Sequence, residues 1–197
     1  MSRVTGLIVT AQLLALSLAL APVHPASARN TADVASAAAS LEPGQFVWQP
    51  DRATEGEVEI LVSVPLQTVY VYRGGTLIGV STASTGRAGY DTPVGRFAIL
   101  QKKVDHRSNL YDDAPMPFMQ RLTWDGIALH AGEIPGYPAS HGCIRLPAPF
   151  ARHLFAATEL GGAVHVTDLA PASAEEALAL VRDADSHTGM GGPEGSD

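Results

Sequence analysis

Closely spaced strand patterns constrain the fold of this chain more than any other feature. β-Branched and aromatic residues dominate three consecutive segments, 58–64, 68–72 and 77–81, as expected for strands with a buried face. The pair Gly74-Gly75 between the second and third segments is typical of a tight hairpin turn. These segments therefore predict a sheet that contains a β-hairpin.

The remaining patterns add more strands than helices. Further strands are expected at 96–101, 127–130 and 164–167. Helices are expected at 149–158, which ends before Gly161-Gly162, and from the capping-box residue Ser173 to about Asp183. The predicted fold class is therefore mostly β, a sandwich-like domain with one or two short helices.

The first 28 residues have the pattern of a secretory signal peptide. Arg3 precedes an apolar run, and Ala26 and Ala28 supply the small side chains that a signal peptidase requires. A membrane anchor is the alternative, but the run of about 14 residues is short of the roughly 20 that span a bilayer. We expect cleavage before Arg29 and no membrane attachment afterwards.

The rest of the chain has room for one domain and its extensions. Residues 29–56 are rich in Ala, Ser and Pro and are expected to form a linker, in which Phe46-Val47-Trp48 is an apolar exception able to dock onto the domain. The domain is expected at 57–168. Residues 169–197 are expected to form a C-terminal helix and a disordered tail.

The charge balance limits the partners that the chain can bind. The formal net charge is −7, from 13 basic and 20 acidic residues, which disfavours nucleic acid and other polyanions. Small or zwitterionic substrates remain compatible with this balance.

Cys143 is the only cysteine of the chain, which is unusual for an exported protein because a lone thiol is open to oxidation and mispairing. It is either an inert packing residue or a reactive thiol with a nearby base. His130, 13 residues upstream at the end of an expected strand, and His141 both offer an imidazole. These neighbours favour a nucleophile.

Other residues near Cys143 fit acyl transfer. Gly142 permits a tight bend, and the amides of Gly142 and Cys143 could then point at an oxyanion. Arg145 supplies a fixed positive charge suited to a carboxylate. The residues alone thus predict acyl transfer to Cys143 near a carboxylate-bearing substrate.

The run Ser140-His141-Gly142-Cys143-Ile144-Arg145, with His130 upstream, resembles the signature of the L,D-transpeptidase catalytic domain family. The element Thr92-Pro93-x-Gly95-x-Phe97 and the strands from Val58 resemble the same family, over residues 57–168 in all. The resemblance implies that Cys143 is the nucleophile, that His130 accepts and donates the proton, and that the carbonyl of Ala131 orients His130. It also implies that Ser140, His141, Gly142 and Arg145 shape the donor pocket.

The family resemblance implies an enzyme of peptidoglycan biosynthesis. Cys143 would attack the bond between a diamino acid and D-alanine in a tetrapeptide stem, and an amine would then take the acyl group from the thioester. Peptidoglycan stem peptides would be the partners of a monomer that needs no metal or other cofactor. The expected location is outside the cytoplasm, with the periplasm preferred.

Several alternatives remain open at this point. An L,D-carboxypeptidase or amide hydrolase would use the same cysteine and histidine, whereas a noncatalytic wall-binding protein would use neither. His130, His141 and Cys143 also form a possible zinc set. The apolar segment 111–124 is either a lid over the acyl site or ordinary core, and His141 has either a catalytic, a hydrogen-bonding or a structural role. The acceptor is either a stem peptide, a protein lysine or a D-amino acid.

Overall fold

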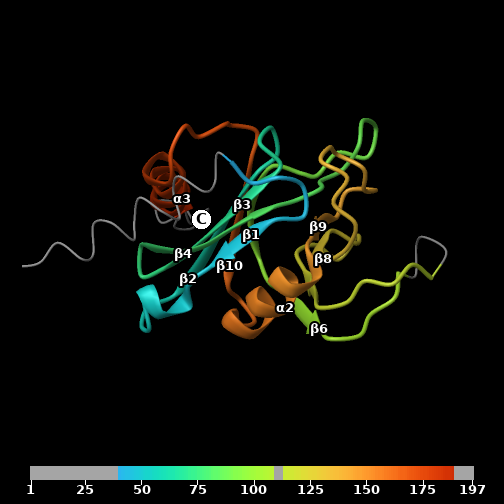
Figure 1. Ribbon diagram of the computed structural model, residues 1–197, viewed down its shortest axis with the longest axis horizontal. Coiled ribbons are helices and arrows are strands. Elements are labelled where there is room, and N and C mark those ends of the chain that lie inside the picture. The colour runs from blue at the N-terminus through green and yellow to red at the C-terminus, as the bar shows by residue number, and fades with distance from the viewer. Residues whose placement is uncertain (1–39, 109–112, 189–197) are drawn as a thin grey trace, which may run out of the picture.

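The computed structural model describes residues 40–108 and 113–188 of the chain and consists mainly of two β-sheets (Figure 1). The larger sheet has six strands in the order β1-β4-β3-β2-β10-β5, and the smaller has four in the order β6-β7-β8-β9. Two α-helices, α2 (Ala148–Ala157) and α3 (Ala174–Thr188), complete the described part. This arrangement confirms the predicted mostly β fold. The predicted signal peptide and the tail from residue 189 lie outside the described residues.

The larger sheet contains the strands that the sequence predicts most clearly. Its members are β1 (Phe46–Trp48), β2 (Val58–Ser63), β3 (Thr68–Arg73), β4 (Thr76–Thr82), β5 (Gly95–Ala98) and β10 (Ala163–Thr167). Gly74 and Gly75, both with positive φ, close the predicted hairpin between β3 and β4. Neighbouring strands run antiparallel except β2 and β10, which are parallel.

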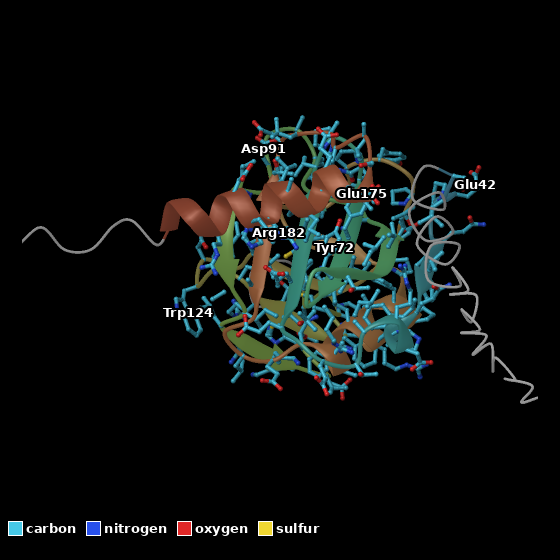
Figure 2. All side chains as sticks on the ribbon, turned by 90° about the vertical axis from the view of Figure 1, so that its left-hand side faces the viewer. Glu42, Tyr72, Asp91, Trp124, Glu175 and Arg182 are labelled. Carbon is cyan, nitrogen blue, oxygen red and sulfur yellow. The ribbon has the colours of Figure 1, made fainter. Side chains whose placement is uncertain are left out.

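Both faces of this sheet are covered, which explains why its central strands are apolar at nearly every position. Ile60, Val62 and Val71 belong to a core shared with the smaller sheet and α2. On the other face, Leu61 and Tyr72 belong to a second core with α3, which lies across the strands in Figure 2. Alternate residues of each strand thus enter opposite cores.

Helix α3 begins as the sequence predicts. The Ser173 hydroxyl accepts a hydrogen bond from the Glu176 amide at 3.2 Å, and the Glu176 carboxylate accepts one from the Ala172 amide at 2.7 Å. These bonds satisfy amides at the start of the helix that have no intrahelical partner. Neither helix of the described part is long and apolar enough to cross a membrane.

The smaller sheet positions the predicted site residues. It consists of β6 (Gln101–Lys103), β7 (Met119–Arg121), β8 (Ala128–Ala131) and β9 (Ile144–Leu146). Strands β8 and β9 are parallel and place His130 opposite Arg145. Their alternate residues, Leu129 and Ile144 among them, are buried in the core shared with the larger sheet.

One predicted strand, 96–101, proves to be two. The chain forms β5 in the larger sheet, leaves it at Ile99 and Leu100, and then forms β6 in the smaller sheet. The Ile99 amide donates to the Gly162 carbonyl, whereas the Leu100 amide donates to the Arg121 carbonyl. The change of partner between adjacent residues divides the strand, and local sequence pattern does not reveal it.

The sheet begins earlier than the predicted domain boundary at residue 57. Phe46–Trp48, within the expected linker, pairs with β4 as strand β1 and is followed by a 3-10 turn, η1 (Pro50–Arg52). The Trp48 ring lies edge-on to Phe150 at 5.6 Å and is stacked on His153 at 5.8 Å. Gly79 makes room for it, since a Cβ there would lie 2.6 Å from the indole.

We expect Trp48→Ala to lower the free energy of unfolding by about 2–3 kcal/mol, less than the 3–5 typical of fully buried aromatic residues because Trp48 is half-buried. Urea unfolding followed by circular dichroism measures this loss. The matched control is Trp124→Ala, because Trp124 is 73% exposed and protrudes from the surface in Figure 2. Equal stability of the two variants would contradict a structural role for β1.

Candidate active site

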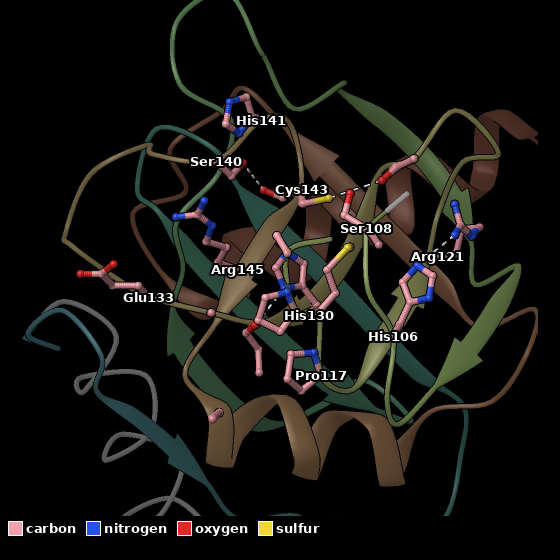
Figure 3. A pocket seen from close by; sticks show the side chains of 18 residues that line it. His106, Ser108, Pro117, Arg121, His130, Glu133, Ser140, His141, Cys143 and Arg145 are labelled. Atoms are coloured by element: carbon pink, nitrogen blue, oxygen red, sulfur yellow. Dashed lines mark hydrogen bonds between the residues drawn. The ribbon is translucent and has the colours of Figure 1, made fainter. Parts of the chain in front are cut away.

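A cavity of about 510 Å³ lies beside strands β8 and β9 (Figure 3). Six of the seven predicted site residues line it: His130, Ala131, Ser140, His141, Cys143 and Arg145. The seventh, Gly142, is buried in the turn that precedes β9. The structure therefore brings together residues that the sequence places in two separate segments.

The register of β8 and β9 explains this meeting. Because side chains alternate along a strand, His130 and its partner Arg145 share one face of the small sheet, and Leu129 and Ile144 share the other. Cys143 immediately precedes Ile144 and thus belongs to the face of His130. The face with Leu129 and Ile144 packs in the core, whereas the face with His130 and Arg145 lines the cavity.

His130 is held in one tautomer. Its Nδ1 atom lies 2.8 Å from the carbonyl oxygen of Ala131, and a carbonyl can only accept, so Nδ1 carries the proton. The Nε2 atom of the neutral ring is then the proton acceptor. The Ala131 amide in turn donates to the Pro117 carbonyl at 2.8 Å, which fixes the orienting peptide.

The charge state of His130 follows from its burial. The side chain is 7% exposed, and burial lowers its pKa to about 4 because the charged imidazolium loses its hydration. The bond to Ala131 opposes this effect, whereas the positive charge of Arg145 adds to it. His130 is therefore neutral at physiological pH and available as a base.

Cys143 is also uncharged in the free protein. Burial raises the pKa of its thiol, although a backbone hydrogen bond from Ala128 and the charges of Arg145 and Arg121 act in the opposite direction. The thiol donates to the carbonyl oxygen of Gly126 at 3.4 Å. Cys143 and His130, the candidate nucleophile and base, are thus a neutral pair rather than a thiolate and an imidazolium.

The turn before Cys143 is fixed by the Ser140 hydroxyl. This hydroxyl donates to the Cys143 carbonyl at 2.6 Å and accepts from the Gly142 amide at 3.0 Å. The Gly142 amide therefore points at Ser140, not at an oxyanion as the sequence suggested. Gly142 has a φ of +109°, and a Cβ there would lie 2.8 Å from the Ile127 side chain, so glycine is required.

His141 and Arg145 occupy different parts of the cavity wall. The His141 ring meets Tyr90 edge-on at 4.7 Å, and the Arg87 guanidinium lies 4.3 Å from the centre of the Tyr90 ring. Arg145 extends along Gly132, where a Cβ would lie 3.0 Å from its side chain. Arg145 thus presents a charge to the cavity, whereas His141 packs against an aromatic ring.

Several lining residues were not predicted as site residues. Met116 and Met119 are buried beside Cys143 with Ala128. Met116 also lines the cavity, so the methionines of the apolar segment contribute to both the core and the cavity wall. His106 and Arg121 line the opposite wall in Figure 3. The sequence carries no local signal for Arg121, because β7 reaches the site only through sheet pairing.

Zinc is not supported by this arrangement. Among residues 40–108 and 113–188, no three His, Cys, Asp or Glu side chains are grouped so that they could hold a metal ion. The possible set of His130, His141 and Cys143 is therefore not formed, which is consistent with the contact of His141 with Tyr90.

Comparison with known proteins agrees with the geometry of the site. The YkuD family model, described as the L,D-transpeptidase catalytic domain, matches residues 57–166. The chain belongs to this family. The match ends two residues before the predicted boundary at 168 and includes Cys143, His130, His141 and Arg145. A search of curated proteins found no match.

Solved L,D-transpeptidases share the fold of this domain. One from Stackebrandtia nassauensis is 29% identical with a TM-score of 0.52, over 58% of this chain and 57% of that one. One from Mycobacterium tuberculosis H37Rv is 26% identical with a TM-score of 0.53, over 56% and 57% of the two chains. L,D-transpeptidase 3 from Mycobacterium tuberculosis, in complex with a faropenem-derived adduct, is 27% identical with a TM-score of 0.52, over 56% and 60%. The chain thus spans less than two thirds of each of these structures.

The charge state of His130 predicts the acid limit of reactivity. Because its pKa is about 4, His130 should remain a neutral base well below the ordinary histidine value of 6.5. The rate of Cys143 acylation should therefore be half-maximal near pH 4 on the acid side. Stopped-flow measurement of acylation by a carbapenem across pH 3.5–8 tests this. A midpoint near 6.5 would show that His130 is hydrated and chargeable in solution.

Proposed function

We propose that this protein is an exported L,D-transpeptidase that forms a thioester at Cys143 and transfers the acyl group to an amine. The observation that carries the proposal is the neutral His130, oriented by the Ala131 carbonyl, in the same cavity as the Cys143 thiol. The family match supports the same reaction class.

In the first step the thiol loses its proton as it attacks. Nε2 of His130 takes the Sγ proton while Sγ bonds to the carbonyl carbon between the diamino acid and D-alanine. The tetrahedral intermediate places a negative charge on the former carbonyl oxygen. The Cys143 amide is the candidate donor to this oxygen, since the Gly142 amide is engaged by Ser140. The imidazolium then protonates the leaving nitrogen, and D-alanine departs.

In the second step an amine attacks the thioester carbonyl. His130 removes a proton from the amine nitrogen and returns it to Sγ as the C–S bond breaks. The new peptide bond replaces the one that was cleaved, so neither step consumes ATP or requires a metal. Limited access of water to the cavity would favour the amine over hydrolysis.

The positive charges of two arginine side chains in the cavity suit a stem peptide that carries a carboxylate. Arg145 and Arg121 both line it, and guanidinium groups pair with carboxylates through two parallel hydrogen bonds. A carboxylate of the stem peptide is therefore a suitable partner for Arg145. The net negative charge of the chain does not prevent this pairing, because both guanidinium groups lie at the cavity itself.

Export rests on residues 1–28 and their signal-peptide pattern. With that segment cleaved, the enzyme would act in the envelope, most suitably in a periplasm, as a monomer in contact with stem peptides. Detection of a mature N-terminus at Arg29 would support this location.

We expect His130→Gln to lower transfer about 10²–10⁴-fold, the usual contribution of a general base, and Cys143→Ala to abolish it. Mass spectrometry of products from a tetrapeptide stem and a D-amino acid measures the exchange. The matched control is His153→Gln, which removes an imidazole stacked on Trp48 outside the cavity and should retain activity.

The same experiment separates the alternatives. Exchanged stems or dimers would support transfer, whereas trimmed tripeptides alone would identify an L,D-carboxypeptidase. If Cys143→Ala were as active as the wild-type protein, the thioester would be excluded. No turnover and no adduct with a carbapenem would favour a noncatalytic wall-binding protein.

A further inference from the structure

The loop of residues 86–92 is joined to the turn that precedes β9 through the buried hydroxyl of Thr92. Thr92 is 5% exposed, and its Oγ1 atom donates to the Gly142 carbonyl at 2.8 Å. The same oxygen accepts from the Gly86 amide at 2.9 Å. Since a carbonyl only accepts and an amide only donates, the direction of both hydrogen bonds is settled.

The position of this hydroxyl is itself well defined. Pro93 follows Thr92 and restricts its backbone to extended conformations. Gly86 closes the loop tightly, because a Cβ there would lie 1.9 Å from the Tyr90 carbonyl oxygen. The Arg87 amide also donates to the Ser140 carbonyl at 3.1 Å. The loop is therefore a fixed support rather than a chance neighbour of the turn.

The peptide group held by Thr92 is the one that contains the Cys143 amide. In a trans peptide the C=O of one residue and the N–H of the next point in opposite directions within one plane. A hydrogen bond that fixes the Gly142 carbonyl therefore also fixes the direction of the Cys143 N–H. Ser140 fixes the adjacent groups, the Gly142 amide and the Cys143 carbonyl.

We propose that Thr92 is a positioning residue for acyl transfer, which aims the Cys143 amide at the developing oxyanion by holding the Gly142 carbonyl. The inference rests on the proposed function, since only an acyl-transfer reaction forms an oxyanion at Cys143. It assigns a role to the Thr92-Pro93 element that lies outside the cysteine motif in sequence.

The role can be separated from a general effect on the thiol. Acylation of Cys143 by a carbapenem opens a ring amide through a tetrahedral oxyanion, and the proton of Sγ ends on the amide nitrogen. Alkylation by iodoacetamide forms a C–S bond and expels iodide without an oxyanion. An oxyanion donor affects only the first reaction. A disordered or displaced thiol affects both.

We expect Thr92→Ala to slow acylation about tenfold to a hundredfold, somewhat less than the 10²–10³ that follows loss of a direct oxyanion donor. Its alkylation rate should stay within about twofold of wild type, as should KM for a stem peptide, because the cavity wall is intact. Thr92→Ser keeps the hydroxyl and should restore acylation. Thr158→Val is the matched control, since Thr158 is also buried and also bonds twice, to Gln120 and Leu154, at the end of α2.

Equal acylation by wild type and Thr92→Ala would overturn the inference, and so would a parallel loss of acylation and alkylation. If Thr92→Ala does not fold, Thr92→Ser and Thr92→Val replace it. The ratio of the acylation rate to the alkylation rate in these two variants then tests the inference in the same way. A wild-type protein that is alkylated but never acylated would instead refute the proposed function and is distinguishable from these outcomes.

Discussion

The parallel pairing of β8 with β9 is the constraint on which the site depends. Parallel neighbours need a crossover connection, commonly of a dozen or more residues, and residues 132–143 provide the minimum of twelve between the two strands. The connection has no helix, and Ser84 and Thr85 hold it through the Tyr137 carbonyl and the amides of Ala139 and Ser140. The short distance between His130 and Cys143 in sequence is thus the length of one tight crossover.

The same sheet holds His130 and Cys143 in buried surroundings, and this burial changes their pKa values. A histidine and a thiol on a fully solvated surface would keep their ordinary pKa values, whereas burial here lowers the pKa of His130 and raises that of Cys143. Both shifts favour the neutral forms, so neither group is charged in the free protein at neutral pH. A resting thiol without charge is also less open to oxidation than a thiolate, and this thiol belongs to the only cysteine of the chain.

The sequence alone predicts those features of the fold and the site whose physical signal is local. The hairpin at Gly74-Gly75, the Ser173 cap and the cluster around Cys143 each depend on neighbouring residues, and each was found in the expected place. The division of the 96–101 strand and the pairing of β1 depend on partners far along the chain, and no periodicity encodes them. The same limit explains why the sequence does not point to Arg121. The Gly142 amide is a different case, because its partner Ser140 lies only two residues away and the conformation of the turn decides which way the amide points.

The passage of one chain between the sheets at Ile99 and Leu100 has a mechanical consequence. Because β5 at the edge of the larger sheet continues into β6 of the smaller one, a covalent link of two residues ties the two layers together at that edge. The two sheets cannot move apart at this edge without breaking the pairing of β5 with β10 or of β6 with β7. The floor of the cavity, which the smaller sheet forms at His130 and Arg145, is therefore held in a fixed position against the larger sheet.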